Sequence, residues 1–265
     1  MAANPPDTTT FEPSHTLTAA DFHGSAGAIF RLALDRATDG YVGIDHDELE
    51  MDLPDAPRCR TTWNAVRDSL SWVDDEHPGA WYHASLPDAS AEFRDLWSLE
   101  DGDSGAFFLH TVVLTIDDEW LFFAVPHHSL CWLNAPDESF VDAVDDALAK
   151  HRACVLPEKT RVEWTGDGRN YSISGTSLCV EGGRLRTRGC YGLSNLETVR
   201  ANEDERTLSL TWQPDPIPGA VGRALMSAMS LVYNPPERLQ FEDEATFRDA
   251  ESILREIIEK RDPTV

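Results

Sequence analysis

Negative charge is concentrated in the first 150 residues of this 265-residue chain, and this asymmetry restricts how the chain can be organised. Residues 1–150 carry 29 Asp and Glu against 7 Arg and Lys, whereas residues 151–265 carry 18 against 15. The first segment therefore accounts for −22 of the formal net charge of −25. A chain of this length fits one large domain or two domains of about 100–200 residues. The charge asymmetry favours two domains, with a boundary near Val155.

The net charge predicts an environment rather than an activity. A net charge this far from zero causes self-repulsion, which salt reduces because charges are screened over about 3 Å at 1 M ionic strength. The 22 basic residues include only three lysines, Lys150, Lys159 and Lys260. An acidic, lysine-poor surface resembles the surfaces of proteins from organisms that keep molar salt in the cytoplasm. We therefore expect a halophilic, cytoplasmic protein.

The composition predicts a folded protein without a membrane helix. Apolar residues make up 41% of the chain, which is enough for packed cores, and no stretch approaches the roughly 20 apolar residues that a membrane helix needs. The segment Met1–Pro13 is rich in Thr and Pro and lacks a secretory signal, so we expect a flexible tail. The five cysteines form no C-x-x-C pair, and their odd number argues against a disulfide framework and a cysteine zinc site. The predicted layout is a tail (1–13), an acidic domain (14–154) and a second domain (155–265).

Hydrophobic spacing in the first domain predicts a mixture of helices and strands. Apolar residues recur at helical steps over residues 29–34, with Gly40 as a stop, and again over residues 62–73. Strict alternation over Glu48–Leu53 predicts a half-buried strand. Further strands are expected at Ala80–Ser85, Ala106–Ile116 and Glu119–Val125, the last two joined by a turn at Asp117 and Asp118.

The second domain has the clearest strand pattern. Residues 177–181 and 184–188 alternate on either side of Gly182 and Gly183, and paired glycines accept the positive φ angles of a two-residue hairpin turn. Strands are also expected at Arg161–Trp164 and Thr207–Trp212, and helical spacing recurs over residues 221–232. The predicted fold class is α+β, with two similar, mainly antiparallel-sheet domains that each end in a C-terminal helix.

Similar short patterns precede the helix that ends each domain. The pattern N-x-P-acid, followed by S/T-F-x-D-A, occurs over residues 134–143 and again over residues 234–250. Ser139 and Thr246 each precede an acidic residue by three positions, which is typical of a capped helix start. The spacing of 107 residues between Phe140 and Phe247 predicts an internal duplication.

The second domain resembles a pleckstrin-homology-like domain. The resemblance rests on the antiparallel meander predicted from Arg161 to Trp212 and on the closing helix predicted from Thr246 to Lys260. It implies a fold that docks lipids, peptides or proteins and does not catalyse a reaction. The helical spacing over residues 221–232 departs from the pattern of this superfamily, which would have strands there.

Basic residues gather in one part of the second domain. Between Arg152 and Cys190 there are seven basic and four acidic residues, a local net charge of +3. Alternate residues of a strand lie about 6.6–6.8 Å apart on one face, so guanidinium groups spaced in this way could grip phosphates or carboxylates. A solvated sheet face with a Glu181–Arg184 pair, or a dock for the acidic first domain, would show the same pattern. The predicted binding residues are Arg161, Arg169, Arg184, Arg186 and Arg188.

Histidines in the first domain support a rival, catalytic interpretation. A hydrolase or transferase site could form near His110, His127 and His128. Separately, Cys131 or Cys154 could form a catalytic pair with His110 or His151. Adjacent residues on a strand face opposite sides, so the pair at 127–128 is more typical of a structural role than of a metal site. The acidic clusters at 45–48 and 74–77 lack the spacing of a calcium loop and are expected to be solvated loops.

The sequence contains no motif for nucleophilic hydrolysis, phosphate cradling or dinucleotide binding. We therefore expect a non-catalytic protein of a high-salt cytoplasm that binds or scaffolds another protein through the arginines of its second domain. The prediction includes no catalytic residue, no metal and no cofactor, and the expected partner is another protein or an anionic ligand. The net negative charge disfavours nucleic acid as a partner.

Overall fold

The computed structural model describes residues 5–19, 21–50, 55–74, 79–101, 108–157, 162–174, 177–182, 187–213 and 235–261. The chain divides into two compact units: unit 1 comprises Met1–Leu17 and Asp21–His151, and unit 2 comprises Thr18–Ala20 and Arg152–Val265. Both contain helices and antiparallel strands, which confirms the predicted α+β class. Among the described residues, no helix has both the length and the apolar character that crossing a bilayer requires.

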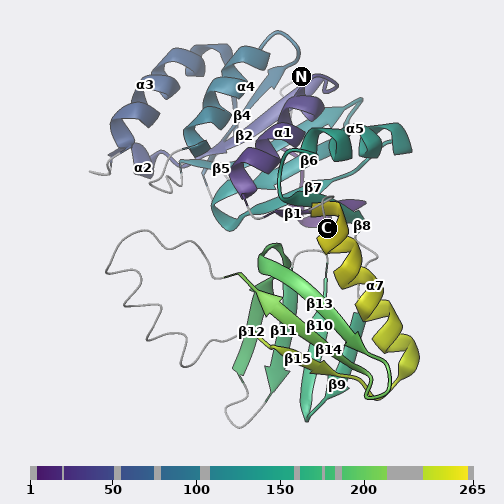
Figure 1. Cartoon of the computed structure of the whole chain (residues 1–265). Coiled ribbons are helices and arrows are strands. Elements are labelled where there is room, and N and C mark those ends of the chain that lie inside the picture. Colours follow the sequence, from purple (N-terminus) through teal and green to yellow (C-terminus); the bar gives the residue numbers. More distant parts are fainter. Residues whose placement is uncertain are drawn as a thin grey trace. The chain divides into compact units, whose positions relative to one another are not determined.

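Unit 1 is built on an antiparallel sheet with helices packed against it (Figure 1). Its elements are η1 (Thr8–Thr10), β1 (His15–Ala19), α1 (Phe22–Leu34), β2 (Asp39–Ile44), α2 (Asp47–Glu50), α3 (Ala56–Val66), η2 (Arg67–Ser69), β3 (Ser71–Asp74), β4 (Ala80–Ser85), α4 (Ser90–Trp97), η3 (Ser98–Asp101), β5 (Leu109–Ile116), β6 (Glu119–Val125), η4 (Pro126–His128), β7 (Leu130–Leu133) and α5 (Glu138–Leu148). Neighbouring strands follow the order β3-β4-β2-β5-β6-β7-β1. A row of directly opposed residues therefore crosses the sheet from Tyr41 through Val113 and Phe123 to Trp132.

One face of this sheet packs against α1 and α4. The Phe30 ring of α1 stacks on the Trp97 ring at the end of α4 with centroids 4.6 Å apart, and both rings contact Phe122 of β6 at 5.8 Å. All three side chains are buried. Large aromatic side chains contribute strongly to a core because each removes about 150–250 Å² from water. The helix expected around residues 29–34 is part of α1.

Gly40 was expected to stop a helix, but it lies within β2. The helix α1 ends at Leu34, and Gly40 pairs with Leu114 of β5. A Cβ atom at position 40 would lie 2.5 Å from the ring of Phe93 on α4, far inside a normal carbon–carbon contact. Glycine is therefore required here because α4 packs closely on the sheet.

The opposite face of the sheet is rich in aromatic residues and carries part of the N-terminal segment. Phe11 stacks on Trp120 with centroids 4.6 Å apart and 8° between the ring planes. The same ring meets Phe123 edge-on at 5.5 Å. The described part of the N-terminal segment thus packs on the sheet, in contrast to the flexible tail expected for Met1–Pro13.

The strands predicted at Ala80–Ser85 and Glu119–Val125 match β4 and β6, and the turn between β5 and β6 is confirmed. Ile116 pairs with Glu119, and the two residues between them, Asp117 and Asp118, have φ angles of 50° and 69°. Aspartate tolerates this left-handed region better than most residues, which suits it to a two-residue hairpin turn.

The strand expected at Glu48–Leu53 is wrong in its described part, because Asp47–Glu50 forms the short helix α2. The Asp45 carboxylate accepts a hydrogen bond from the Asp47 amide at 3.0 Å. An aspartate that bonds to the backbone two residues later forms a turn, and here the turn leads into helix. Alternation of acidic and apolar residues does not reveal this local bond. Residues 51–54 lie outside the described part of the chain.

The helix expected at 62–73 is shorter than predicted. Its first part belongs to α3, which ends at Val66, and a 3₁₀ turn follows. Ser71 and Trp72 then pair with His83 and Tyr82 of β4. Of the two apolar residues at helical spacing beyond Val66, Val73 therefore lies in the strand β3, and Leu70 directly precedes it.

Unit 2 contains two small antiparallel sheets and a long C-terminal helix (Figure 1). Its elements are β8 (Ala153–Pro157), β9 (Val162–Gly166), β10 (Arg169–Ile173), β11 (Ser177–Gly182), β12 (Thr187–Gly192), η5 (Leu193–Asn195), β13 (Leu196–Asn202), β14 (Thr207–Trp212), β15 (Arg238–Gln240) and α7 (Glu244–Arg261). One sheet has the order β12-β11-β10-β9, and the other has the order β13-β14-β15. The strand predicted at Thr207–Trp212 matches β14, whereas the helical spacing over residues 221–232 lies outside the described residues.

The core of unit 2 joins the two sheets to α7. Trp164 of β9 stacks on Tyr171 of β10 at 5.0 Å and on Phe241 at 4.6 Å, and its indole N–H donates to the Gln240 carbonyl at 3.2 Å. Phe241 in turn meets Phe247 of α7 at 5.7 Å. This cluster continues with buried residues from both sheets and the helix: Ile173, Leu178, Leu208, Leu210, Leu254 and Ile257.

The helices that end the two units share an acidic cap. The Asp137 carboxylate accepts from the Phe140 amide at 2.9 Å, and the Asp243 carboxylate accepts from the Thr246 amide at 2.7 Å. The hydroxyl groups of Ser139 and Thr246, expected to cap the helices, instead donate to these carboxylates. The aspartates cap better because a carboxylate also interacts favourably with the helix dipole. The sheets of the two units differ in strand order, so the predicted duplication is not confirmed.

Candidate functional site

The five arginines predicted to bind a partner are only partly described by the structure. Arg161, Arg184 and Arg186 lie outside the described residues. Arg169 is exposed at the start of β10. Because side chains alternate along a strand, position 169 faces the same side of the sheet as Tyr171 and the opposite side from Asn170. Burial raises the pKa of Tyr171, and Arg169 opposes that rise. Arg169 therefore does not share a sheet face with its neighbour Asn170.

The strand register of the predicted hairpin differs from the expected one. Gly182 pairs with Thr187, so residues 183–186 lie between the paired positions of β11 and β12. Glu181 is therefore directly opposite Arg188 and not opposite Arg184, as a two-residue turn would require. A paired-glycine signal does not set loop length by itself, because longer hairpin loops also use glycine.

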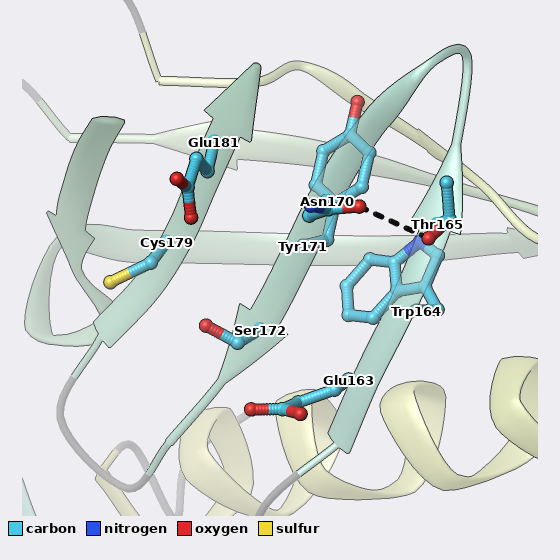
Figure 2. A pocket seen from close by; sticks show the side chains of 8 residues that line it. All are labelled: Glu163, Trp164, Thr165, Asn170, Tyr171, Ser172, Cys179 and Glu181. Carbon is cyan, nitrogen blue, oxygen red and sulfur yellow. Dashed lines mark hydrogen bonds between the residues drawn. The ribbon is translucent and has the colours of Figure 1, made fainter. Parts of the chain in front are cut away.

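The outward side of the β9–β12 sheet carries polar residues in two cross-strand rows. Each row follows the observed register: Thr165, Asn170 and Glu181 form one, beside backbone position 188, and Glu163, Ser172, Cys179 and Cys190 form the other. We use the name outer face for Glu163, Thr165, Asn170, Ser172, Cys179 and Glu181, which Figure 2 shows.

The outer face forms an open hollow of about 500 Å³, which Trp164 and Tyr171 also line. Glu163, Thr165, Asn170 and Glu181 are exposed, and Thr165 donates a hydrogen bond to the Asn170 side-chain oxygen at 3.1 Å. The buried side of the same sheet is apolar, which is the usual arrangement for an antiparallel sheet with one solvated face. The outer face therefore offers broad polar contact rather than an enclosed cavity.

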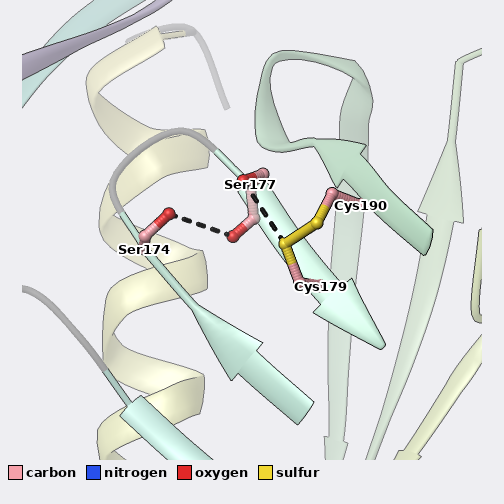
Figure 3. The surroundings of a disulfide bond; sticks show 4 residues. All are labelled: Ser174, Ser177, Cys179 and Cys190. Carbon is pink, nitrogen blue, oxygen red and sulfur yellow. Dashed lines mark hydrogen bonds between the residues drawn. A yellow bond between two sulfur atoms is a disulfide. The ribbon is translucent and has the colours of Figure 1, made fainter. Parts of the chain in front are cut away.

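A disulfide joins two strands at one side of the outer face (Figure 3). Cys179 of β11 and Cys190 of β12 are directly opposite and bonded, with Cα atoms 4.0 Å apart. The Ser177 hydroxyl lies 3.8 Å from the Cys179 sulfur. The sequence-based argument against disulfides is therefore wrong for this pair. The expected two-residue turn would place Cys179 opposite Arg186. Because this register was wrong, the sequence did not predict that Cys179 and Cys190 are opposite each other.

The three histidines of the catalytic interpretation lie together. The His110 and His127 ring centroids are 4.5 Å apart, and those of His127 and His128 are 4.1 Å apart. Burial, and secondarily the charge of His128, lower the pKa of His127 below its ordinary value. His127 is therefore mainly neutral at pH 7 and able to accept a proton. Within the described parts of the chain, no set of three or more His, Cys, Asp or Glu side chains is placed to hold a metal ion.

Cys131 is a poor nucleophile in this structure. It is completely buried, and burial raises the pKa of its thiol. The thiolate is the reactive form of cysteine, so a protonated, inaccessible thiol does not attack a substrate. Cys154 is also buried and carries no disulfide. Both cysteines considered as nucleophiles are therefore buried away from solvent.

A second hollow, missed by sequence reasoning, lies in unit 1 between α2, α3 and β4. His46, expected to be in a solvated loop, bonds through Nε2 to the Tyr82 hydroxyl at 2.8 Å. Both rings pack against Trp63 of α3. The hollow is about 620 Å³ and is lined by His46, Leu49, Glu50, Arg60, Trp63, Asn64, Arg67, Asp68 and Tyr82. The sequence shows that Trp63 and Tyr82 are aromatic, but it does not show that they lie together. Sheet pairing brings Tyr82 to this end of the unit.

Comparison with known proteins gives no match: no family model, no curated protein and no solved structure matches this chain. The resemblance of the second domain to pleckstrin-homology-like domains therefore stays a prediction. The outer face, the histidine cluster and the second hollow are the candidate sites of this chain.

Proposed function

We propose that this chain is a non-catalytic binding or scaffolding protein of a high-salt cytoplasm and that unit 2 is a pleckstrin-homology-like docking module. Two observations support the second part of the proposal. The strands β9 to β12 form an antiparallel meander, β13 and β14 pair antiparallel in a second sheet, and the long helix α7 closes the unit. These are the features on which the resemblance rests, and the fold it implies docks ligands rather than transforming them.

The observation that carries the binding role is the exposed polar surface of the β9–β12 sheet. Side chains from β9, β10 and β11 contribute to the outer face in regular register, and the hollow between them is open. Small-molecule sites are usually concave and mostly apolar, whereas protein interfaces have broad polar rims. The outer face fits the second description better.

Charge indicates the chemistry of the partner. The segment from Arg152 to Cys190 has a net charge of +3 within a chain of −25, so it is the part of unit 2 with the strongest attraction for an acidic segment of another protein. Position 188 lies at the end of one row of the outer face, opposite Glu181. Arg184 and Arg186 belong to the sequence that connects β11 to β12. The proposed contact is therefore formed by Arg184, Arg186 and Arg188 and by the uncharged residues Thr165, Asn170 and Ser172 of the outer face, because Glu163 and Glu181 are themselves acidic.

The test measures binding of a defined acidic probe. A fluorescein-labelled peptide of alternating Glu and Ser is titrated with the full chain, and anisotropy is recorded at low and at molar KCl, with a Gln–Ser peptide as the neutral probe. Combining Arg184→Glu, Arg186→Glu and Arg188→Glu should weaken binding of the acidic peptide by about tenfold or more, because charge-assisted hydrogen bonds are lost and repulsion is added. Molar salt should weaken wild-type binding as well.

The matched control carries the same change of charge elsewhere in unit 2. Arg200, Arg238 and Arg255 are exposed, and the ion pairs of Arg238 and Arg255 are at the surface, where such pairs contribute little to stability. Their combined replacement by Glu should leave more affinity than the first triple variant. Equal loss in both variants would show a non-specific charge effect, and the proposed contact would then be wrong.

The alternative is a hydrolase or transferase near the histidine cluster, and the convergence of His110, His127 and His128 favours it. The neutral state of His127 suits a general base. The test is hydrolysis of 4-nitrophenyl acetate and 4-nitrophenyl phosphate by the full chain and by the His127→Gln variant. Turnover that the substitution reduces by about a hundredfold would establish the alternative, in line with the usual contribution of a general base. Equal rates for both proteins would exclude a role for His127.

A further inference from the structure

We propose that the hollow between α2, α3 and β4 is a binding site for a small aromatic carboxylate. The site lies in unit 1 and is independent of the proposed docking face in unit 2. Its volume of about 620 Å³ falls in the range of about 300–1,000 Å³ that is usual for small-molecule sites, and the hollow is at least as open to solvent as the one on the outer face.

The floor of the hollow is aromatic. Trp63 is 6% exposed, and its ring lies 4.8 Å from Tyr82 and 5.3 Å from His46, with interplanar angles of 69° and 66°. Phe108 supports Trp63 from a further side at 6.0 Å. Rings that pack on one another in this edge-to-face manner are held rigidly, so the partly exposed rings of His46 and Tyr82 meet a planar ligand without having to reorganise, with Trp63 beneath them.

A polar pair is fixed within this aromatic floor. His46 Nε2 and the Tyr82 hydroxyl are 2.8 Å apart, and the tautomer of His46 decides which group donates. The position of His46 is set by the turn that follows β2, in which the Leu49 amide donates to the His46 carbonyl at 3.1 Å. The pair therefore gives one oriented polar contact in an otherwise apolar floor, a feature that selects among ligands of similar shape.

Two guanidinium groups lie at the rim. Arg60 donates through Nη1 to the Leu49 carbonyl at 2.5 Å, which ties α2 to α3 and holds Arg60 at the hollow. Arg67 lies one and a half to two helical turns further along, with its Nε 3.7 Å from the exposed Asp68 carboxylate. A guanidinium has five N–H donors in a planar fork that matches a carboxylate, so each group has further donors for a ligand.

The charge of the rim disfavours a ligand with several negative charges. Arg60 and Arg67 are balanced by Glu50 and Asp68, which also line the hollow. Unit 1 belongs to the part of the chain that carries a net charge of −22. A polyphosphate would be repelled by Glu50 and Asp68 and by the net negative charge of unit 1. One carboxylate attached to an aromatic ring would accept hydrogen bonds from the guanidinium groups while the ring packs on the aromatic floor.

The experiment uses the full chain and a panel of defined probes. Benzoate and indole-3-acetate are titrated by calorimetry and by NMR, with benzamide as the neutral analogue and cyclohexanecarboxylate as the non-aromatic one. The expected result is that the two aromatic acids bind and shift the ring resonances of Trp63 and Tyr82, while the two analogues bind at least about tenfold more weakly, the loss expected when a charged or aromatic contact is removed.

Two variants separate a specific site from general attraction. Arg67→Gln should weaken benzoate binding by about fivefold or more, whereas Arg58→Gln, the same change of charge on α3 away from the hollow, should leave it unchanged. Asn64→Trp places a bulky ring at the exposed rim and should abolish binding without disturbing the fold. Failure of both aromatic acids to bind, or equal binding by the Asn64→Trp variant, would overturn the proposal.

Discussion

Cys179 and Cys190 face each other across β11 and β12 and are joined by a disulfide. Within the described part of unit 2, β12 is the last strand of its sheet and pairs with β11 alone. Cys190 is exposed, and Cys179 is half-buried. The bond therefore holds an edge strand in register, where backbone pairing alone is weakest.

Replacing Cys190 by Ser should lower the unfolding free energy of unit 2 by about 2–3 kcal/mol, because the cross-link that restricts the unfolded chain is lost. The sequence separation of 11 residues places the bond among short loops, for which the entropic effect is moderate. Urea unfolding followed by tryptophan fluorescence checks this value. A reductant should lower the stability of the wild type to that of the variant and leave the variant unchanged; the same response in both proteins would mean that the bond contributes nothing.

Gly40→Ala should destabilise unit 1 by about 1–3 kcal/mol, the usual cost of overpacking a core. The added methyl group would meet the Phe93 ring, and Phe93 is 1% exposed and cannot turn into solvent. Phe93→Leu should relieve part of this clash, so the double variant should lose less stability than the sum of the two single variants. Thermal unfolding of the four proteins in a double-mutant cycle measures the coupling. Additive losses would contradict the proposed contact.

Phe11→Ala should release the N-terminal segment from the aromatic face of unit 1. The stacked contact with Trp120 is worth about 1 kcal/mol beyond the area that it buries. Limited proteolysis should then cleave before Ser14 faster than in the wild type, while the rest of the chain is protected equally. Phe11→Tyr keeps the stacking ring and serves as the control. Unchanged cleavage in Phe11→Ala would show that other contacts hold the segment.

Stability should depend on pH through His127. Its pKa in the folded protein is lowered, so the unfolded chain takes up the proton first as the pH falls. The contribution of neutral His127 is complete above the unfolded value of about 6.5 and decreases as the pH falls from there through the lowered folded pKa. Melting temperatures between pH 7.5 and about pH 5 should therefore fall more steeply for the wild type than for His127→Gln. His151→Gln, outside the cluster, is the matched control and should retain the wild-type slope.

Local patterns predicted the elements whose partners are close in sequence. Asp117 and Asp118 form the predicted turn because their own conformational preferences suit it, and the strands on both sides follow from alternation. The α+β class was predictable for the same reason: hydrophobic periodicity distinguishes helix from strand wherever a segment is long enough to show its period. The acidic residues that open α5 and α7 lie beside the predicted starts, and only the choice of capping group was wrong.

Only the tertiary structure decided the register of β11 and β12, the role of Gly40 and the two hollows. The disulfide depends on which residues of two strands are opposite, and loop length sets that pairing, not the composition of either strand. Gly40 is explained by Phe93, 53 positions later, and His46 meets Tyr82 across 36 positions. Contacts between distant positions depend on packing and sheet order, which the periodicity of a single segment does not specify.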